Sequence, residues 1–153
     1  MQKSRITTIV GTRPEIIRLS ATISLLENHF EHRLIHTGQN STNFMKDIFF
    51  EELGVRKPDL EIQFENTSLA TNLATILVGV EKDLIENRPD AVVVLGDTNS
   101  ALSVIIAKRM GIPVYHLEAG NRSFDPNVPE EINRKLVDRK STRLNSSHAN
   151  VSR

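Results

Sequence analysis

Short apolar runs alternate along the chain with stretches in which apolar residues recur every three or four positions. The clearest run is AVVVLG, Ala91–Gly96, which is continuously apolar and rich in β-branched residues. A run of this kind is typical of a strand buried on both faces of a parallel sheet. Four further runs have the composition of strands and end at turn residues: 5–10, 32–37, 59–64 and 114–117.

Helical spacing fills most of the segments between these runs. Two shorter helices are predicted near residues 43–53 and 100–109, and two longer ones follow the first and third runs. The longest must end near Arg88, because Pro89 disfavours helical geometry in the residue before it. The apolar faces of the two longer helices consist of Ile16, Leu19, Ile23 and Leu26 in one, and Leu69, Leu73, Ile76, Leu77, Val80 and Leu84 in the other.

This alternation predicts one α/β domain, Rossmann-like, with a doubly wound parallel sheet that helices cover on both faces. The length agrees with this, since 153 residues suit a single domain with its own core. Ligands of such domains bind beyond the carboxyl ends of the strands. The residues that follow each strand are therefore the candidates for chemistry.

Composition narrows the classes of function. Nineteen basic and nineteen acidic residues cancel, so no overall charge gathers nucleic acid or anionic lipid. The lack of cysteine excludes disulfides and thiolate metal sites, and the five histidines show no metal-ligand spacing. No apolar run approaches the roughly 18–20 residues of a membrane span. We expect a cytoplasmic protein with no bound metal and with neither nucleic-acid nor membrane partners.

The segment GTRPE after the first strand has the features of an anion site. Gly11 permits a tight turn, and the next helix is expected to offer free N–H groups and the positive end of its dipole. Arg13 adds a planar guanidinium suited to phosphate oxygens, and Arg18 lies about one helical turn further along. The alternative is a capped helix with an arginine on its surface. The chain lacks GxxxxGK[ST] and GxGxxG, which argues against a P-loop nucleotidase or an ordinary dinucleotide binder.

Polar residues also follow the second and fourth strands. Gln39, Asn40 and Asn43 can hydrogen-bond a sugar or nucleotide, although such side chains cap helices equally well. Asp97 follows the apolar run and precedes a helix, so its carboxylate is expected at the sheet edge where a substrate would lie. A helix N-cap or a magnesium ligand is the alternative role for Asp97.

Carboxylates and arginines come together after the fifth strand. Glu118 directly follows that strand, Arg122 can pair with it or with a phosphate, and Glu130 and Glu131 open a helix. The helix dipole by itself favours negative charge at that position. Because successive strands end at one edge of the sheet, Asp97 and Glu118 are expected to be neighbours. Carboxylates beside arginines can be held at different pKa values and so share acid and base roles.

Five motifs, in this order and spacing, resemble the non-hydrolysing UDP-N-acetylglucosamine 2-epimerase family. They are GTRPEIIRL, TGQN, RPDAVVVLGDTNSALS, GIPVYHLEAGNR and VPEEINRKLVD, and they cover roughly Ile6 to Asp138. The version of the motifs around Glu118 looks most like members that act on UDP-2-acetamido sugars for surface polysaccharide, including those that use a 6-deoxy amino sugar.

The resemblance implies a GT-B-like architecture of two Rossmann-like domains, with residues 1–138 as the amino-terminal domain, and a homodimer. It implies inversion of C2 of a UDP-N-acetylhexosamine, without a cofactor, by elimination of UDP and its re-addition. Asp97, Glu118 and Glu130 match the catalytic carboxylates of the family. Arg13 and Arg18 match positions that face the diphosphate, and many relatives have lysine at the latter position.

Two features depart from the family pattern. Asn40 replaces the histidine of TGQH, where a regulatory substrate site begins in many bacterial members, so Gln39 is a less certain contact and activation by substrate is not expected. The family continues into a second domain with a catalytic histidine, but residues 139–153 here read RKSTRLNSSHANVSR. This polar segment lacks apolar periodicity and is predicted to be a disordered, non-native tail; a natural linker is the alternative. The chain would then hold half of a composite site and be inactive alone.

Two other functions remain open from the sequence. One is a half-domain of a GT-B glycosyltransferase, which would move the sugar to an acceptor and leave C2 unchanged. The other is a non-enzymatic module that binds anions or nucleotide sugars through the GTRPE segment.

Overall fold

A computed structural model describes residues 3–38, 50–63, 68–138 and 142–144. Six parallel strands form one sheet in the order β3-β2-β1-β4-β5-β6. The strands are β1 (Arg5–Val10), β2 (Glu31–His36), β3 (Leu60–Glu61), β4 (Ala91–Leu95), β5 (Val114–Leu117) and β6 (Thr142–Leu144). The predicted parallel α/β fold is confirmed.

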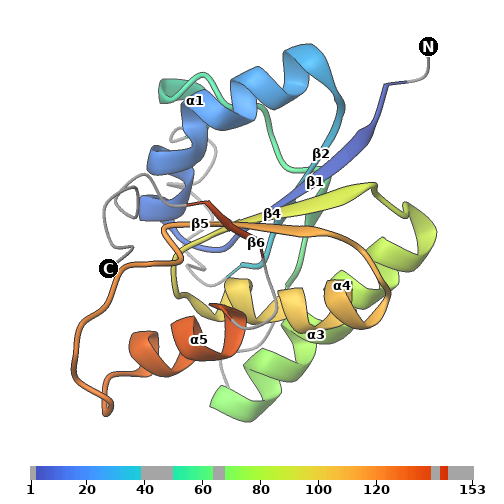
Figure 1. Cartoon of the computed structure of the whole chain (residues 1–153). Helices are drawn as coiled ribbons and strands as arrows, with labels where there is room; N and C mark the ends of the chain where they lie inside the picture. The colour runs from blue at the N-terminus through green and yellow to red at the C-terminus, as the bar shows by residue number, and fades with distance from the viewer. Residues whose placement is uncertain (1–2, 39–49, 64–67, 139–141, 145–153) are drawn as a thin grey trace.

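Helices cover both faces of the sheet (Figure 1). Helix α1 (Arg13–His29) lies on one face, and α3 (Leu69–Glu86), α4 (Val104–Arg109) and α5 (Pro129–Asp138) lie on the other. The short 3-10 helix η1 (Asn99–Ser103) leads into α4. Because all the strands are parallel, they all begin at one edge of the sheet and all end at the opposite edge.

Two apolar clusters follow from the side-chain alternation of the strands. Ile9 belongs to the cluster under α3 and α4, whereas the next residue, Val10, belongs to the cluster under α1. On β2, Leu34 and Ile35 divide in the same way. All five residues of β4 are buried, as expected for a central strand covered on both faces.

The structure differs from the predictions in three places. The expected helix over 100–109 begins as a 3-10 helix, and β3 covers two of the five described residues of the run 59–64. Within the segment predicted to be disordered, residues 142–144 form β6, whose backbone pairs with β5. Pairing with an available strand edge does not require apolar periodicity, which explains why the pattern missed β6. Most of the predicted helix 43–53 lies outside the described residues.

None of the helices in the described part of the chain has the length and apolar content needed to cross a membrane.

A buried histidine on β2 is expected to make the free energy of unfolding depend on pH. The His32 Nε2 atom is 2.8 Å from the Thr8 hydroxyl oxygen, and its Nδ1 atom is buried without a hydrogen-bond partner among the described residues. Burial, assisted by the positive charge of Arg56, lowers the pKa of His32 to about 4. Between about pH 4 and 6.5 the ring is therefore neutral in the folded chain and protonated in the unfolded chain.

We predict that the free energy of unfolding decreases as the pH falls from 7 to 5, because the unfolded chain binds the additional proton. Replacing His32 with Gln should reduce this decrease by roughly 1–2 kcal/mol, the range set by the lowered pKa. Urea unfolding at both pH values measures the difference. His29→Gln, which changes an exposed histidine on α1, serves as the control and should keep the full decrease. The same pH dependence in His32→Gln as in the unaltered chain would contradict the assignment.

Candidate active site at the carboxyl edge of the sheet

A pocket of about 380 Å³ lies where β1, β4 and β5 end. The strand register brings these ends together, since Leu95 pairs with Leu117 and the next residues, Gly96 and Glu118, leave the sheet side by side. Three carboxylates and two arginines line the pocket with polar and apolar neighbours: Thr12, Pro14, Glu15, Arg18, Leu95, Gly96, Asp97, Thr98, Glu118, Asn121 and Arg134. Glu15 is the buried one of the three acids. The predicted meeting of Asp97 and Glu118 is found in the structure.

Glu118 is paired with Arg18 across the pocket. The Arg18 Nη1 donates to Glu118 Oε2 at 2.8 Å, and the side chains are 57% and 34% exposed. The amide of Asn121 donates to the same oxygen at 3.3 Å. Glu118 also has a φ of 58°, a conformation that costs a non-glycine residue about 1–3 kcal/mol and concentrates at functional sites. The Glu118 carboxylate is thus held by the backbone conformation, by the Asn121 amide and by Arg18 of α1.

Asp97 is held from the side of α5. Its carboxylate forms an ion pair with Arg134, whose Nη1 also lies 3.3 Å from Glu131 Oε2. The Asn133 amide donates to the Asp97 carbonyl oxygen at 2.9 Å. Arg134 is only 9% exposed, so its ion pairs with these two carboxylates are largely shielded from water. The Asp97 side chain therefore has a fixed direction at the pocket wall.

A second histidine supports the turn before Asp97 from within the sheet. His116 on β5 is fully buried, and its Nε2 lies 2.5 Å from the Gly96 carbonyl oxygen. Burial lowers the pKa of His116, so the ring is neutral and donates Nε2–H to that carbonyl. His116 lies one residue before the end of β5 and fixes the backbone at Gly96.

The start of α1 differs from the anion site that the sequence suggested. The Glu15 carboxylate already accepts the Gly11 N–H at 3.0 Å and the Thr12 N–H at 2.7 Å. The N–H groups of Gly11 and Thr12, which precede the first residue of α1, are therefore not available to a phosphate. The free N–H groups expected in the helix itself stay a prediction. Arg13 is exposed and does not line the pocket. Of the two arginines predicted here, only Arg18 faces the pocket.

The loop after β5 separates its charged residues into two groups. Arg122 donates to Asp138 Oδ2 at 2.9 Å and to the carbonyl oxygens of Ala119 and Asn121, both at 2.7 Å. The expected alternative pairing of Arg122 with Glu118 is not found, because Arg18 occupies that carboxylate. Glu131 is buried beside Arg122 and Arg134. Glu130 is exposed at the start of α5 and lies outside the pocket lining.

Sequence reasoning missed Arg134 and Thr98 and gave Glu15 no role. Arg134 lies three residues after Glu131, a spacing that puts both on one helix face and could have indicated the pair. Thr98 and Glu15 lie far apart in sequence, so no local signal joins them. Gln39 and Asn40 lie outside the described residues. Within the described ranges, no group of three metal-ligating side chains is assembled.

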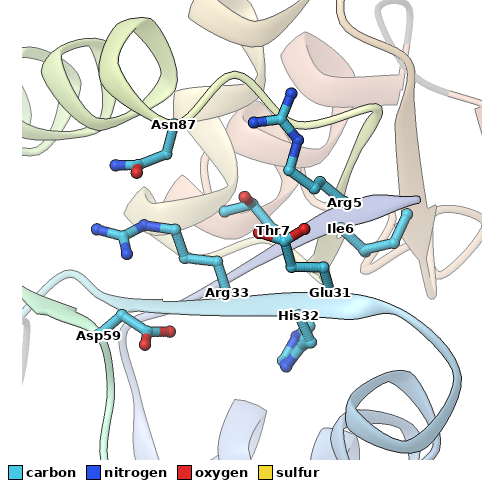
Figure 2. A pocket seen from close by; sticks show the side chains of 8 residues that line it. All are labelled: Arg5, Ile6, Thr7, Glu31, His32, Arg33, Asp59 and Asn87. Carbon is cyan, nitrogen blue, oxygen red and sulfur yellow. The ribbon is translucent and has the colours of Figure 1, made fainter. Parts of the chain in front are cut away.

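A second pocket, of about 200 Å³, lies at the opposite edge of the sheet, where β1 and β2 begin (Figure 2). Two of its charged side chains, Arg33 and Asp59, are paired with residues outside the pocket lining. The Arg33 Nε donates to both oxygens of Asp83 at 2.9 Å, and Arg56 Nη2 donates to Asp59 Oδ2 at 2.7 Å. Such pairs fit a structural role at this edge.

Comparison with known proteins gives a consistent result. The family described as UDP-N-acetylglucosamine 2-epimerase matches residues 24–150. A protein of that name from Methanocaldococcus jannaschii is 43% identical over 142 residues, which are 92% of this chain and 39% of the relative. A Pseudomonas aeruginosa UDP-2,3-diacetamido-2,3-dideoxy-D-glucuronate 2-epimerase is 36% identical over 90% of this chain and 40% of its own length. The chain thus spans about two fifths of the length of these relatives.

Solved structures agree with the sequence comparison. The Methanocaldococcus jannaschii UDP-GlcNAc 2-epimerase, crystallised with UDP-GlcNAc and UDP, has a TM-score of 0.86 over 92% of this chain and 39% of that one, at 43% identity. Acinetobacter baumannii MurG has a TM-score of 0.66 at 12% identity, over 93% of this chain and 41% of that one. The second likeness shows the fold alone.

The ion pairs predict a difference between the two arginines of the pocket. Arg134→Met leaves Asp97 without its cation and removes one of the three cations beside the buried Glu131, and should lower the free energy of unfolding by about 3 kcal/mol. Arg18→Met removes an exposed partner and should lower it by less than about 1 kcal/mol. Urea unfolding at neutral pH compares the two variants. Equal losses would show that Arg134 does not hold Asp97 as described.

Proposed function

Because the chain belongs to the UDP-N-acetylglucosamine 2-epimerase family, we propose that it supplies part of the active site of an enzyme that inverts C2 of a UDP-N-acetylhexosamine. The product would serve as a precursor of surface polysaccharide. Since the chain spans about two fifths of its relatives, the complete site is proposed to need a second domain. The full enzyme then has the GT-B-like arrangement, with the substrate between the two domains.

One observation carries this proposal: Asp97, Glu118 and Arg18 line one pocket at the sheet edge. Carboxylates and a cation at one place suit a reaction that moves a proton and separates charge. The relative crystallised with UDP-GlcNAc and UDP has the same fold over nearly all of this chain. That relative binds UDP-GlcNAc and UDP, which supports a UDP-sugar as the ligand proposed for this pocket.

The proposed reaction has two halves. A base removes the C2 proton while the bond between C1 and the diphosphate oxygen breaks, which gives a 2-acetamidoglycal and UDP. The diphosphate oxygen then adds back to C1, and a proton is delivered to the opposite face of C2. Positive character at C1 is stabilised by carboxylates, and the negative charge on UDP is stabilised by arginines.

The residues take roles that fit their places. Asp97 and Glu118 border the pocket and are proposed to move the C2 proton and stabilise the sugar, with Glu130 contributing from the start of α5. Arg18 is proposed to bind the diphosphate, with Arg13 beside it at the start of α1. Arg122 and Gln39 remain predicted substrate contacts, although Arg122 is engaged with Asp138 here. No cofactor takes part.

The proposal extends to the assembly of the full enzyme, which the resemblance implies is a homodimer. Residues 69–80 on α3 contain no charged residue, and Leu69 and Val78 are among the exposed apolar side chains. Exposed apolar surface of this kind supports contact with another protein surface. The cytoplasmic location expected from the composition is part of the same proposal.

A glycosyltransferase half-domain is the second candidate, and the family match and the names of the relatives favour the epimerase over it. The non-enzymatic binding module is not favoured either, because the relatives are named as 2-epimerases. The product separates the first two functions. A transferase leaves C2 unchanged, whereas the epimerase exchanges its proton with solvent.

The test joins the chain to the part of a relative that it does not span. Residues 1–138 are joined to the remaining carboxyl-terminal part of the Methanocaldococcus jannaschii relative and incubated with UDP-GlcNAc in D₂O. We expect deuterium at C2 by proton NMR and the appearance of the C2 epimer. The 153-residue chain alone should incorporate none. A folded hybrid that never exchanges C2 would rule out the proposal.

Substitution of the two pocket carboxylates tests their roles in the same hybrid. Asp97→Asn and Glu118→Gln should each lower the exchange rate about 100-fold or more, because each removes a group that changes charge during proton transfer. Glu52→Gln, at an exposed position away from the pocket, is the control and should leave the rate unchanged. Wild-type rates in both pocket variants would contradict the proposed catalytic roles of Asp97 and Glu118.

A further inference from the structure

We propose that Glu15 is a positioning residue that ties the turn before α1 to the turn that carries Asp97, and so fixes Arg18 and Asp97 on opposite walls of the pocket. This inference rests on the proposed function. It assigns a role to a buried acid that touches neither the C2 proton nor the diphosphate in the proposed reaction.

The Glu15 carboxylate uses both oxygens, one for each turn. Oε2 accepts the Gly11 N–H, the Thr12 N–H and the Thr12 hydroxyl, at 3.0, 2.7 and 2.8 Å. Oε1 accepts the Thr98 hydroxyl at 2.9 Å. Glu15 and Thr98 are 83 residues apart in the chain, so this bond joins the end of β1 to the end of β4 directly.

Burial makes this arrangement more than a helix cap. Glu15 is 3% exposed, and burying a carboxylate is costly unless its lone pairs are satisfied. An N-cap alone needs only the bonds to Oε2. The bond to Thr98 goes beyond the helix, and it reaches the residue next to Asp97.

The Asp97 turn is thereby held from three directions. Thr98 is bound to Glu15 on the side of α1, Asp97 is bound to Arg134 and Asn133 on the side of α5, and His116 holds Gly96 from the sheet. Arg18 lies on the same helix as Glu15, one turn further along. Loss of the Glu15–Thr98 bond therefore frees one side of the turn and leaves the separation of Arg18 and Asp97 unfixed.

The test separates the bridge from the helix cap by changing Thr98. Thr98→Val keeps the shape of the side chain, keeps all three bonds to Oε2 and removes only the bridge. Thr98→Ser keeps the hydroxyl and should rescue the function. Thr22→Val makes the same chemical change two turns along α1, outside the pocket lining, and is the matched control.

The first measurement uses the 153-residue chain and does not depend on any catalytic activity. Backbone ¹⁵N relaxation at Asp97 and Asn99 reports the order of the turn. We expect a lower heteronuclear NOE in Thr98→Val and in Glu15→Gln, with Thr98→Ser and Thr22→Val unchanged. An unaltered NOE in Thr98→Val would overturn the proposal, whatever the outcome for epimerisation.

The second measurement uses the hybrid enzyme of the proposed function. We expect kcat for C2 exchange to fall about tenfold in Thr98→Val with KM changed less than about twofold, because a displaced reacting group lowers the chemical step more than binding. Thr98→Ser should recover the rate. Equal kcat in Thr98→Val and Thr22→Val would contradict the positioning role. A hybrid without any activity would refute the proposed function instead, and the NMR result would still decide the role of Glu15.

Discussion

The parallel pairing of β4 between β1 and β5 is the constraint on which the pocket depends. This pairing places the ends of three strands at one edge, with Leu95 beside Leu117 and the Gly96 N–H bonded to the Leu117 carbonyl. The residues that leave the sheet there are then neighbours although they lie far apart in the sequence. A slip of one residue would reverse the inward and outward faces of β4 and move Asp97 relative to Glu118. The apolar burial of β4 therefore also sets the geometry of the polar site.

At this edge of the sheet, each of two arginines on helices forms an ion pair with a carboxylate that follows a strand. Arg18 of α1 pairs with Glu118 after β5, and Arg134 of α5 pairs with Asp97 after β4. The first pair is partly exposed and held by one short bond, whereas the second is largely buried and shared with Glu131. Exposed pairs contribute little to stability and exchange partners readily, while buried pairs are rigid. The pocket thus combines a partly exposed ion pair on the side of α1 with a largely buried one on the side of α5.

Sequence and structure agree most closely where the signal is local. The apolar run Ala91–Gly96 and the helical spacing of residues 69–84 predicted β4 and α3 nearly to the residue, because side-chain period follows directly from backbone geometry. The sequence predictions agree less well with the structure where pairing between strands decides which residues form a strand. Residues 59–64 give only the short edge strand β3, and Thr142–Leu144 becomes a strand in a polar segment because β5 offers an edge.

By itself, the sequence determined the fold class, the strand ends as the place for chemistry, and the nearness of Asp97 and Glu118. These follow from periodicity, composition and the rule that parallel strands end together. Only the tertiary structure decided the partner of each charged group: Arg18 rather than Arg122 for Glu118, Arg134 for Asp97, and the N–H groups of Gly11 and Thr12 for Glu15. The reason is physical, since a guanidinium or carboxylate can reach several partners along its flexible side chain. Which one it meets depends on how helices from distant parts of the chain pack against the sheet.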